Sequence, residues 1–131
     1  MKFLGTGSAL PKKVVSNDDL AQVMDTSDEW IRSRTGIGMR HIAVEETTTS
    51  MAVEAAEKAL ADAKISGCEI DLIIAGTISP DYIFPSLACE VQAAIGAKSA
   101  TAFDLSAGCS GFLFALATAD AYFLSLIHIS E

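Results

Sequence analysis

One cysteine in the chain stands where a thiol can act as a nucleophile. Cys109 lies in the segment 103–112, F-D-L-S-A-G-C-S-G-F, which predicts the end of a strand, a turn of small residues and the start of an apolar helix. The positive end of a helix favours the thiolate form of a cysteine placed there. The free N–H of Cys109 is also placed to stabilise an oxyanion on an acyl group bound to its own sulfur. Cys109 is therefore the candidate nucleophile for acyl transfer.

The other cysteines and the histidines offer weaker chemistry. A single cysteine on an apolar helix usually serves packing, and this remains the alternative for Cys109. Cys89 lies inside a predicted helix and is expected in the core, whereas Cys68 lies in a predicted loop. The three cysteines form no C-x-x-C pair and stand far from His41 and His128 in sequence. Neither a disulfide framework nor a metal site is expected, and the cysteine usage favours a reducing, cytoplasmic compartment.

The elements that must position Cys109 alternate between strands and helices. Short apolar runs bounded by turn residues predict strands at 2–10, 39–44, 71–77 and 99–105. Amphipathic or apolar stretches predict helices after residue 17, from 26, at 51–64, at 86–95 and from about 110. This alternation predicts an α/β fold with a mostly parallel sheet. Ligand sites in such sheets lie at the carboxyl ends of the strands, where Cys109 is expected.

Local signals predict where several helices begin and end. Asn17 is expected as the N-cap of a short helix. Thr26 begins the next helix, with Glu29 three residues later at capping-box spacing. Glycines are expected to end the helices at Gly36, Gly67 and Gly96.

Composition excludes some classes of protein. The chain has 131 residues and a formal net charge of −8, which argues against a nucleic-acid partner. Half of its residues are hydrophobic, which excludes disorder for most of the chain and is high for a short domain. We therefore expect part of a larger core, or a subunit with a large interface. The apolar stretch 111–129 is interrupted by Asp120 and is expected to be a buried helix rather than a membrane span.

Several collinear stretches together resemble one enzyme family. They cover about residues 1–122 and comprise G-T-G-S at 5–8 with L-P at 10–11, D-T-S-D-E-W-I at 25–31, R-T-G-I at 34–37, R-H-I-A at 40–43, F-P-S at 84–86, A-F-D at 102–104 and C-S-G-F at 109–112. This combination resembles β-ketoacyl-acyl-carrier-protein synthase III, the condensing enzyme that initiates type II fatty acid synthesis. The resemblance implies a thiolase fold and a homodimer.

The resemblance implies a reaction and a set of site residues. Cys109 would take an acyl group from acyl-CoA, commonly acetyl-CoA, and malonyl-acyl-carrier protein would condense with it after losing carbon dioxide. No cofactor or metal is implied, because acyl-CoA is a substrate. Trp30 matches the residue that stacks on the CoA adenine, Arg34 a basic residue near the nucleotide, and Thr26 a residue along the same tunnel. Phe84 matches an aromatic residue that reaches into the partner's acyl pocket.

These residues also have simpler interpretations. By type alone, Trp30 would pack its helix, Arg34 would be a solvated charge and Phe84 would be buried under its own loop. His41 does not match the family's catalytic histidine and is expected to be structural.

The family's enzyme is much longer than this chain, and its catalytic histidine and asparagine lie in a second half that has no counterpart here. We therefore expect residues 1–122 to be an N-terminal thiolase-like half, inactive in condensation by itself. Residues 123–131 depart from the pattern, like translated adapter or vector sequence. His128 is not a catalytic candidate, because 19 residues separate it from Cys109 along one helix. The alternatives are a related starter synthase that uses another acyl-CoA, and a non-catalytic fragment that associates through its apolar surface.

Overall fold

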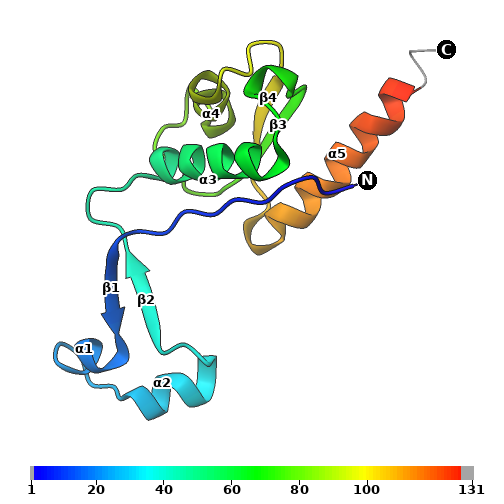
Figure 1. The fold of residues 1–131 in the computed structure, drawn as a ribbon. Helices are drawn as coiled ribbons and strands as arrows, with labels where there is room; N and C mark the ends of the chain where they lie inside the picture. The colour runs from blue at the N-terminus through cyan, green and yellow to red at the C-terminus, as the bar shows by residue number, and fades with distance from the viewer. Residues whose placement is uncertain (1, 128–131) are drawn as a thin grey trace. The chain divides into compact units, whose positions relative to one another are not determined.

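A computed structural model describes residues 2–127 of the chain. His128 and the rest of the predicted non-family tail beyond residue 127 lie outside the described residues. The chain forms two compact units (Figure 1). The smaller unit is Leu10–Thr47, and the larger unit contains the residues up to Ala9 and from Thr48 onward.

The larger unit is built on a parallel β-α-β arrangement. Strands β3 (Leu72–Gly76) and β4 (Thr101–Leu105) pair in parallel, with Leu72 opposite Thr101 and Gly76 opposite Leu105. Helix α4 (Leu87–Ile95) connects them. The predicted parallel sheet is thus confirmed for this pair, and both strands lie within their predicted ranges.

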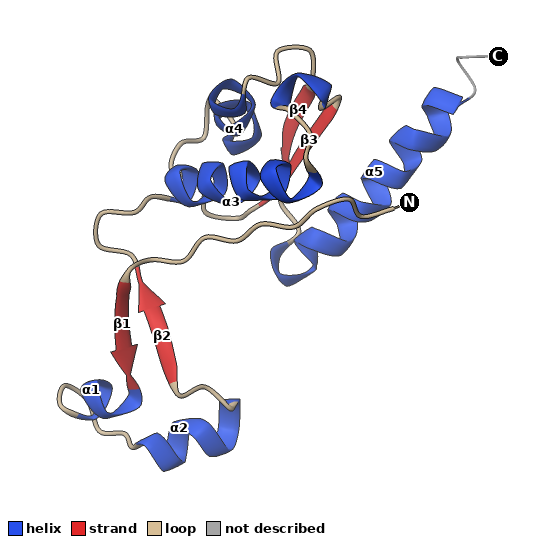
Figure 2. Ribbon diagram, in the orientation of Figure 1, coloured by secondary structure: helices blue, strands red, loops and turns tan. Residues whose placement is uncertain are grey.

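Helices pack against both strands. Helix α4 and helix α5 (Gly111–Ile127) each contact β3 and β4, and α3 (Thr48–Ala63) packs against α4 (Figure 2). The buried apolar side chains gather at α4 and just after it, at Leu87, Ala88, Val91 and Ala97. Helix α4 begins after the N-cap Ser86 and ends at Gly96 in the left-handed conformation, as predicted.

Helix α5 is more exposed than the sequence predicts. Its aromatic and aliphatic side chains include Phe112, Leu113 and Phe114, all exposed. The 18-residue stretch Gly108–Ser125 is long and apolar enough to cross a membrane by length and composition alone, and 6% of it is buried. The expectation of a buried helix was wrong for this chain, because most of the described side chains of α5 are exposed although β3 and β4 contact it.

The segment before the smaller unit forms no strand, contrary to prediction. Residues 2–10 follow helix α3 instead, where Thr6 donates its N–H to Asp62 at 2.9 Å and Lys58 donates to the carbonyl of Ser8 at 2.9 Å. Gly5 and Gly7 lie directly against the backbone of α3, where any Cβ would overlap it. The small residues that suggested a turn therefore serve a close approach to a helix.

Helix α3 also ends earlier than predicted. It stops at Ala63, and Lys64 follows with a left-handed φ of 59°. Gly67 instead begins a short 3₁₀ turn, η1 (Gly67–Glu69). It is buried against the carbonyl of Ile95, so its missing side chain permits contact with α4 rather than ending a helix.

The smaller unit pairs two antiparallel strands and two helices. Strands β1 (Lys13–Ser16) and β2 (Met39–Ile42) pair in antiparallel orientation. The segment between them in the sequence forms α1 (Asn17–Ala21) and α2 (Asp28–Thr35). Strand β1 was not predicted. The predicted N-caps were wrong by one residue in each helix: Ser16 caps α1 in place of Asn17, and Ser27 caps α2 in place of Thr26. The predicted end of α2 at Gly36 is confirmed, with a left-handed φ of 73°.

Candidate functional site

Cys109 lies in a tight turn between a strand and a helix. Strand β4 ends at Leu105, and the 3₁₀ turn η2 (Gly108–Ser110) carries the cysteine immediately before α5. Gly108 has a φ of 52°, a conformation that favours glycine over any residue with a side chain. Cys109 is a free, exposed thiol at the N-terminal end of a 17-residue helix, where the helix dipole favours negative charge. The predicted strand–turn–helix setting is present, with α5 beginning two residues after the cysteine.

The backbone at the end of β3 lies close to the backbone at the start of α5, directly after this turn. Gly76 ends β3 and Gly111 begins α5, and a Cβ built on Gly76 would lie 3.2 Å from the carbonyl carbon of Gly111. This distance is shorter than most Cβ contacts, so a side chain at Gly76 would push Gly111 away by a few tenths of an ångström. Cys109 therefore lies at the carboxyl end of the parallel strands, the edge where α/β sheets bind ligands.

Asp104 links the same strand to helix α4. Its carboxylate accepts hydrogen bonds from the N–H groups of Leu87 at 2.9 Å and Ala88 at 2.8 Å. A carboxylate at the positive end of a helix both satisfies free N–H groups and interacts well with the helix dipole. No role was predicted for Asp104 from the sequence. The available signal was an acidic residue between the apolar Phe103 and Leu105 of a strand, which requires a partner.

Phe84 lies in the loop between β3 and α4. Asp81, in the same loop, accepts hydrogen bonds from the N–H groups of Thr48 at 3.1 Å and Thr49 at 2.7 Å, where α3 begins. The loop is thus anchored, yet Phe84 is 90% exposed and Ile83 is 99% exposed. The simple interpretation of Phe84 as a residue buried under its own loop is wrong for this chain.

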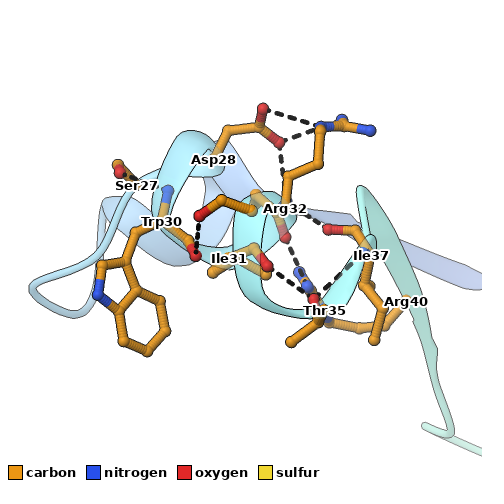
Figure 3. Close-up of polar contacts among 10 residues, drawn as sticks. Ser27, Asp28, Trp30, Ile31, Arg32, Thr35, Ile37 and Arg40 are labelled. Carbon is orange, nitrogen blue, oxygen red and sulfur yellow. Dashed lines mark hydrogen bonds and ion pairs between the residues drawn. The ribbon is translucent and has the colours of Figure 1, made fainter.

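In the smaller unit, helix α2 presents an aromatic–guanidinium pair. The guanidinium carbon of Arg34 lies 4.5 Å from the centroid of the Trp30 ring. Trp30 is 53% exposed and donates its backbone N–H to the N-cap Ser27, while its indole points away from the Asp28–Arg32 ion pair (Figure 3). About half of the Trp30 surface is therefore accessible to a ligand. A planar ring beside a guanidinium suits a ligand that combines an aromatic base with phosphate.

Thr26 is half-buried and lies immediately before the N-cap of the same helix. The predicted site residues are thus divided between the two units. The larger unit carries Cys109 and Phe84, and the smaller unit carries Thr26, Trp30 and Arg34.

Other titratable groups have local partners. The ring Nδ1 of His41 lies 2.6 Å from the carbonyl oxygen of Pro11, and Cys89 is half-buried on α4. Cys68 lies 3.0 Å from the hydroxyl of Ser66. Within residues 2–127, no three side chains of His, Cys, Asp or Glu gather in a way that would hold a metal ion.

Comparison with known proteins shows extensive similarity in sequence. No family model matches the chain. It is 62% identical over 111 residues to the β-ketoacyl-[acyl-carrier-protein] synthase III of Streptococcus suis (strain 05ZYH33), a match that covers 85% of this chain and 34% of that protein. It is 58% identical over 121 residues to the synthase III 1 of Bacillus anthracis, covering 92% of this chain and 39% of that protein. The chain thus spans just over a third of the length of these curated relatives.

Solved structures show the same relationship. The 3-oxoacyl-[acyl-carrier-protein] synthase III of Aquifex aeolicus VF5 superposes with a TM-score of 0.91 at 55% identity, covering 95% of this chain and 40% of that one. The priming β-ketosynthase of the R1128 polyketide pathway superposes with a TM-score of 0.84 at 40% identity. The match covers 88% of this chain and 35% of that one.

The fold is that of the thiolase class, of which this chain spans a part. Within that class, the particular resemblance predicted from the sequence, to β-ketoacyl-acyl-carrier-protein synthase III, is confirmed.

Proposed function

We propose that the chain is part of a 3-oxoacyl-acyl-carrier-protein synthase III, which condenses acetyl-CoA or another acyl-CoA with malonyl-acyl-carrier protein to begin fatty acid synthesis. The observation that carries this proposal is the exposed thiol of Cys109 in a glycine-shaped turn at the N-terminus of α5. A reactive cysteine needs an accessible sulfur and a positive local potential, and this position supplies both.

The chemistry assigned to Cys109 has two stages. Its thiolate attacks the thioester carbonyl of acyl-CoA, a new C–S bond forms, and the CoA thiolate leaves. Malonyl-acyl-carrier protein then loses carbon dioxide, and the resulting carbanion attacks the acyl-cysteine carbonyl. The new C–C bond releases the Cys109 thiolate and gives 3-oxoacyl-acyl-carrier protein. A thiolate suits both stages because it attacks well and leaves well.

In this proposal helix α2 binds the nucleotide part of CoA. The exposed ring of Trp30 stacks on the adenine, Arg34 lies near the phosphates, and Thr26 lines the approach. The 4.5 Å stack of Arg34 on Trp30 supports this assignment, because both groups are already held together on one accessible surface.

The remaining assignments follow from the same family. Phe84 would contribute to the acyl pocket of a partner subunit in a homodimer, and its 90% exposure leaves it free to do so. We place the enzyme in the cytoplasm and assign it no cofactor, no metal and no nucleic-acid or membrane partner. Condensation itself is expected to be absent from this 131-residue chain, because the histidine and asparagine of the family are not in it.

A related starter synthase with a different acyl-CoA is the second candidate. The similarity to a priming β-ketosynthase of polyketide synthesis supports it, with a TM-score of 0.84 at 40% identity. Incubation of the chain with acetyl-CoA, longer acyl-CoAs and branched acyl-CoAs, followed by intact-mass analysis, separates the two. An adduct on Cys109 from acetyl-CoA alone supports the first candidate, and preference for another acyl group supports the second. If no acyl-CoA modifies Cys109, the chain is a non-catalytic fragment.

A further inference from the structure

The smaller unit is organised around a buried amide instead of an apolar core. Asn17 is 1% exposed, and within Leu10–Thr47 it is the one residue that is fully buried. Burial of an amide is unfavourable unless its hydrogen-bonding groups are paired. The bonds of Asn17 therefore determine which arrangement of this unit is stable.

The side-chain nitrogen of Asn17 holds both ends of helix α2. Its Nδ2 donates to the carboxylate of Asp28 at 2.8 Å and to the carbonyl of Ile37 at 2.7 Å. Asp28 is the first residue of α2, and Ile37 directly follows the glycine that ends it. Because one nitrogen carries both bonds, the eight-residue helix cannot slide along its axis without breaking one of them.

The remaining groups of Asn17 fix it to the strands. Its Oδ1 accepts from a guanidinium nitrogen of Arg40 at 2.5 Å, and the same guanidinium reaches the carbonyl of Val15 at 3.4 Å. The backbone N–H of Asn17 donates to the carbonyl of Gly38 at 3.2 Å. The side chain of Asn17 thereby connects both ends of α2 to Arg40 of β2, and Arg40 in turn reaches Val15 of β1.

Trp30 and Arg34 lie on the helix that Asn17 holds. Both project from α2, and neither receives a hydrogen bond from Asn17. We infer that Asn17 is a positioning residue, which sets the register of α2 and so presents the Trp30–Arg34 pair to an adenine nucleotide. The nucleotide part of this inference rests on the proposed function of the same helix.

The protein contains a single tryptophan, so its fluorescence reports on this helix alone. The first measurement is acrylamide quenching of Trp30 in the full chain, for the wild type and for Asn17→Ala. The second is a titration with CoA, followed by the change in the same fluorescence. Asn17→Ala should raise the quenching constant. It should also weaken CoA binding about tenfold, because only the correctly placed fraction of α2 binds.

Two further variants separate positioning from general stability. Ser16→Ala removes the N-cap of the neighbouring helix α1 and touches no bond to α2, so it should leave both measurements near the wild-type values. Asn17→Asp combined with Asp28→Asn rebuilds the bond between these two side chains with its polarity reversed. This double variant should recover part of the quenching protection and of the CoA affinity that Asn17→Asp loses.

The possible outcomes are distinct. If Ser16→Ala changes Trp30 as much as Asn17→Ala does, or if the double variant recovers nothing beyond Asn17→Asp, the positioning role is wrong. If the wild type binds no CoA, the nucleotide function of α2 fails, and the quenching series still decides whether Asn17 sets the position of Trp30. If Asn17→Ala binds CoA as tightly as the wild type, the inference is overturned while the proposed function stands.

Discussion

The guanidinium of Arg34 lies 4.5 Å from the ring centroid of Trp30, one helical turn further along α2. The pair places a cation on one face of an exposed aromatic ring. A CoA nucleotide offers an aromatic base and phosphates, so both members of the pair have a matching group in the proposed ligand.

Replacement of Arg34 tests whether the pair acts as a ligand site. Arg34→Ala should weaken CoA binding about tenfold, a loss of about 1.4 kcal/mol, through the missing cation. Arg34→Lys should recover only part of it, because an ammonium group cannot stack as a planar guanidinium does. Isothermal titration with CoA measures both values. Arg32→Ala is the matched control, since Arg32 pairs with Asp28 on the same helix and does not stack on Trp30. An equal loss in the Arg32 variant would contradict a specific role for Arg34.

The link between Asp104 and α4 should be important for stability. Asp104→Ala leaves the N–H groups of Leu87 and Ala88 without their acceptor inside a packed region, at a cost of about 1–3 kcal/mol. Urea unfolding followed by circular dichroism gives the free energy of unfolding. Asp120→Ala, on the exposed surface of α5, is the control and should change it little. Equal stability of the two variants would show that the Asp104 bonds contribute nothing.

Acid should weaken the hydrogen bonds that the Glu46 carboxylate accepts from the backbone of the smaller unit. Hydrogen bonds from the N–H of Lys12, and then of Val44, lower the pKa of the Glu46 carboxyl from 4.5 to about 2. A carboxyl whose pKa is lowered by folding stabilises the fold above its unfolded pKa, and this stabilisation is lost as pH falls from about 4.5 toward 2. Glu46→Gln should therefore make the protection of the Lys12 and Val44 amides less dependent on pH in this window.

Hydrogen exchange of these two amides measures the effect. Glu57→Gln, which removes an exposed carboxylate from α3 in the larger unit, should leave their pH dependence as in the wild type. If Glu46→Gln shows the same dependence as the wild type, the Glu46 bonds do not hold the two segments together.

Close packing at Gly76 should be intolerant of a side chain. Gly76→Ala places a Cβ 3.2 Å from the backbone of Gly111, so α5 must shift at the turn that carries Cys109. The thiol should then react with iodoacetamide at a changed rate in the variant. Gly36→Ala, in the smaller unit, meets no atom within 4 Å and should leave the reactivity of Cys109 unaltered even though its backbone is strained. Unchanged reactivity in Gly76→Ala would contradict the coupling of β3 to this turn.

Local signals predicted the elements in which several cues agree. Helix α4 has a serine at its N-cap, a glycine at its C-terminal end and apolar residues on one face. The two strands that it contacts are short apolar runs. The strand–turn–helix setting of Cys109 was predicted because it is a local pattern of small residues around one thiol.

The predictions that failed concern residues whose partners are distant in the sequence. Residues 2–10 were predicted as a strand, but Gly5 and Gly7 fit against a helix some 50 residues away, which no local pattern reveals. Asn17 was interpreted as a helix cap because asparagine favours caps, whereas its amide is buried by partners that follow 11 to 23 residues later. The role of Asp104 in strand β4 was not predicted for the same reason, since its partners belong to helix α4.

Intact-mass and peptide-mass analysis of the chain after incubation with acetyl-CoA tests the role of Cys109 most directly. The proposal predicts one added acetyl group, located on Cys109, absent from Cys109→Ala and retained in Cys89→Ala and Cys68→Ala. Acetylation spread over the three cysteines, or an unmodified Cys109 in a folded chain, would contradict it.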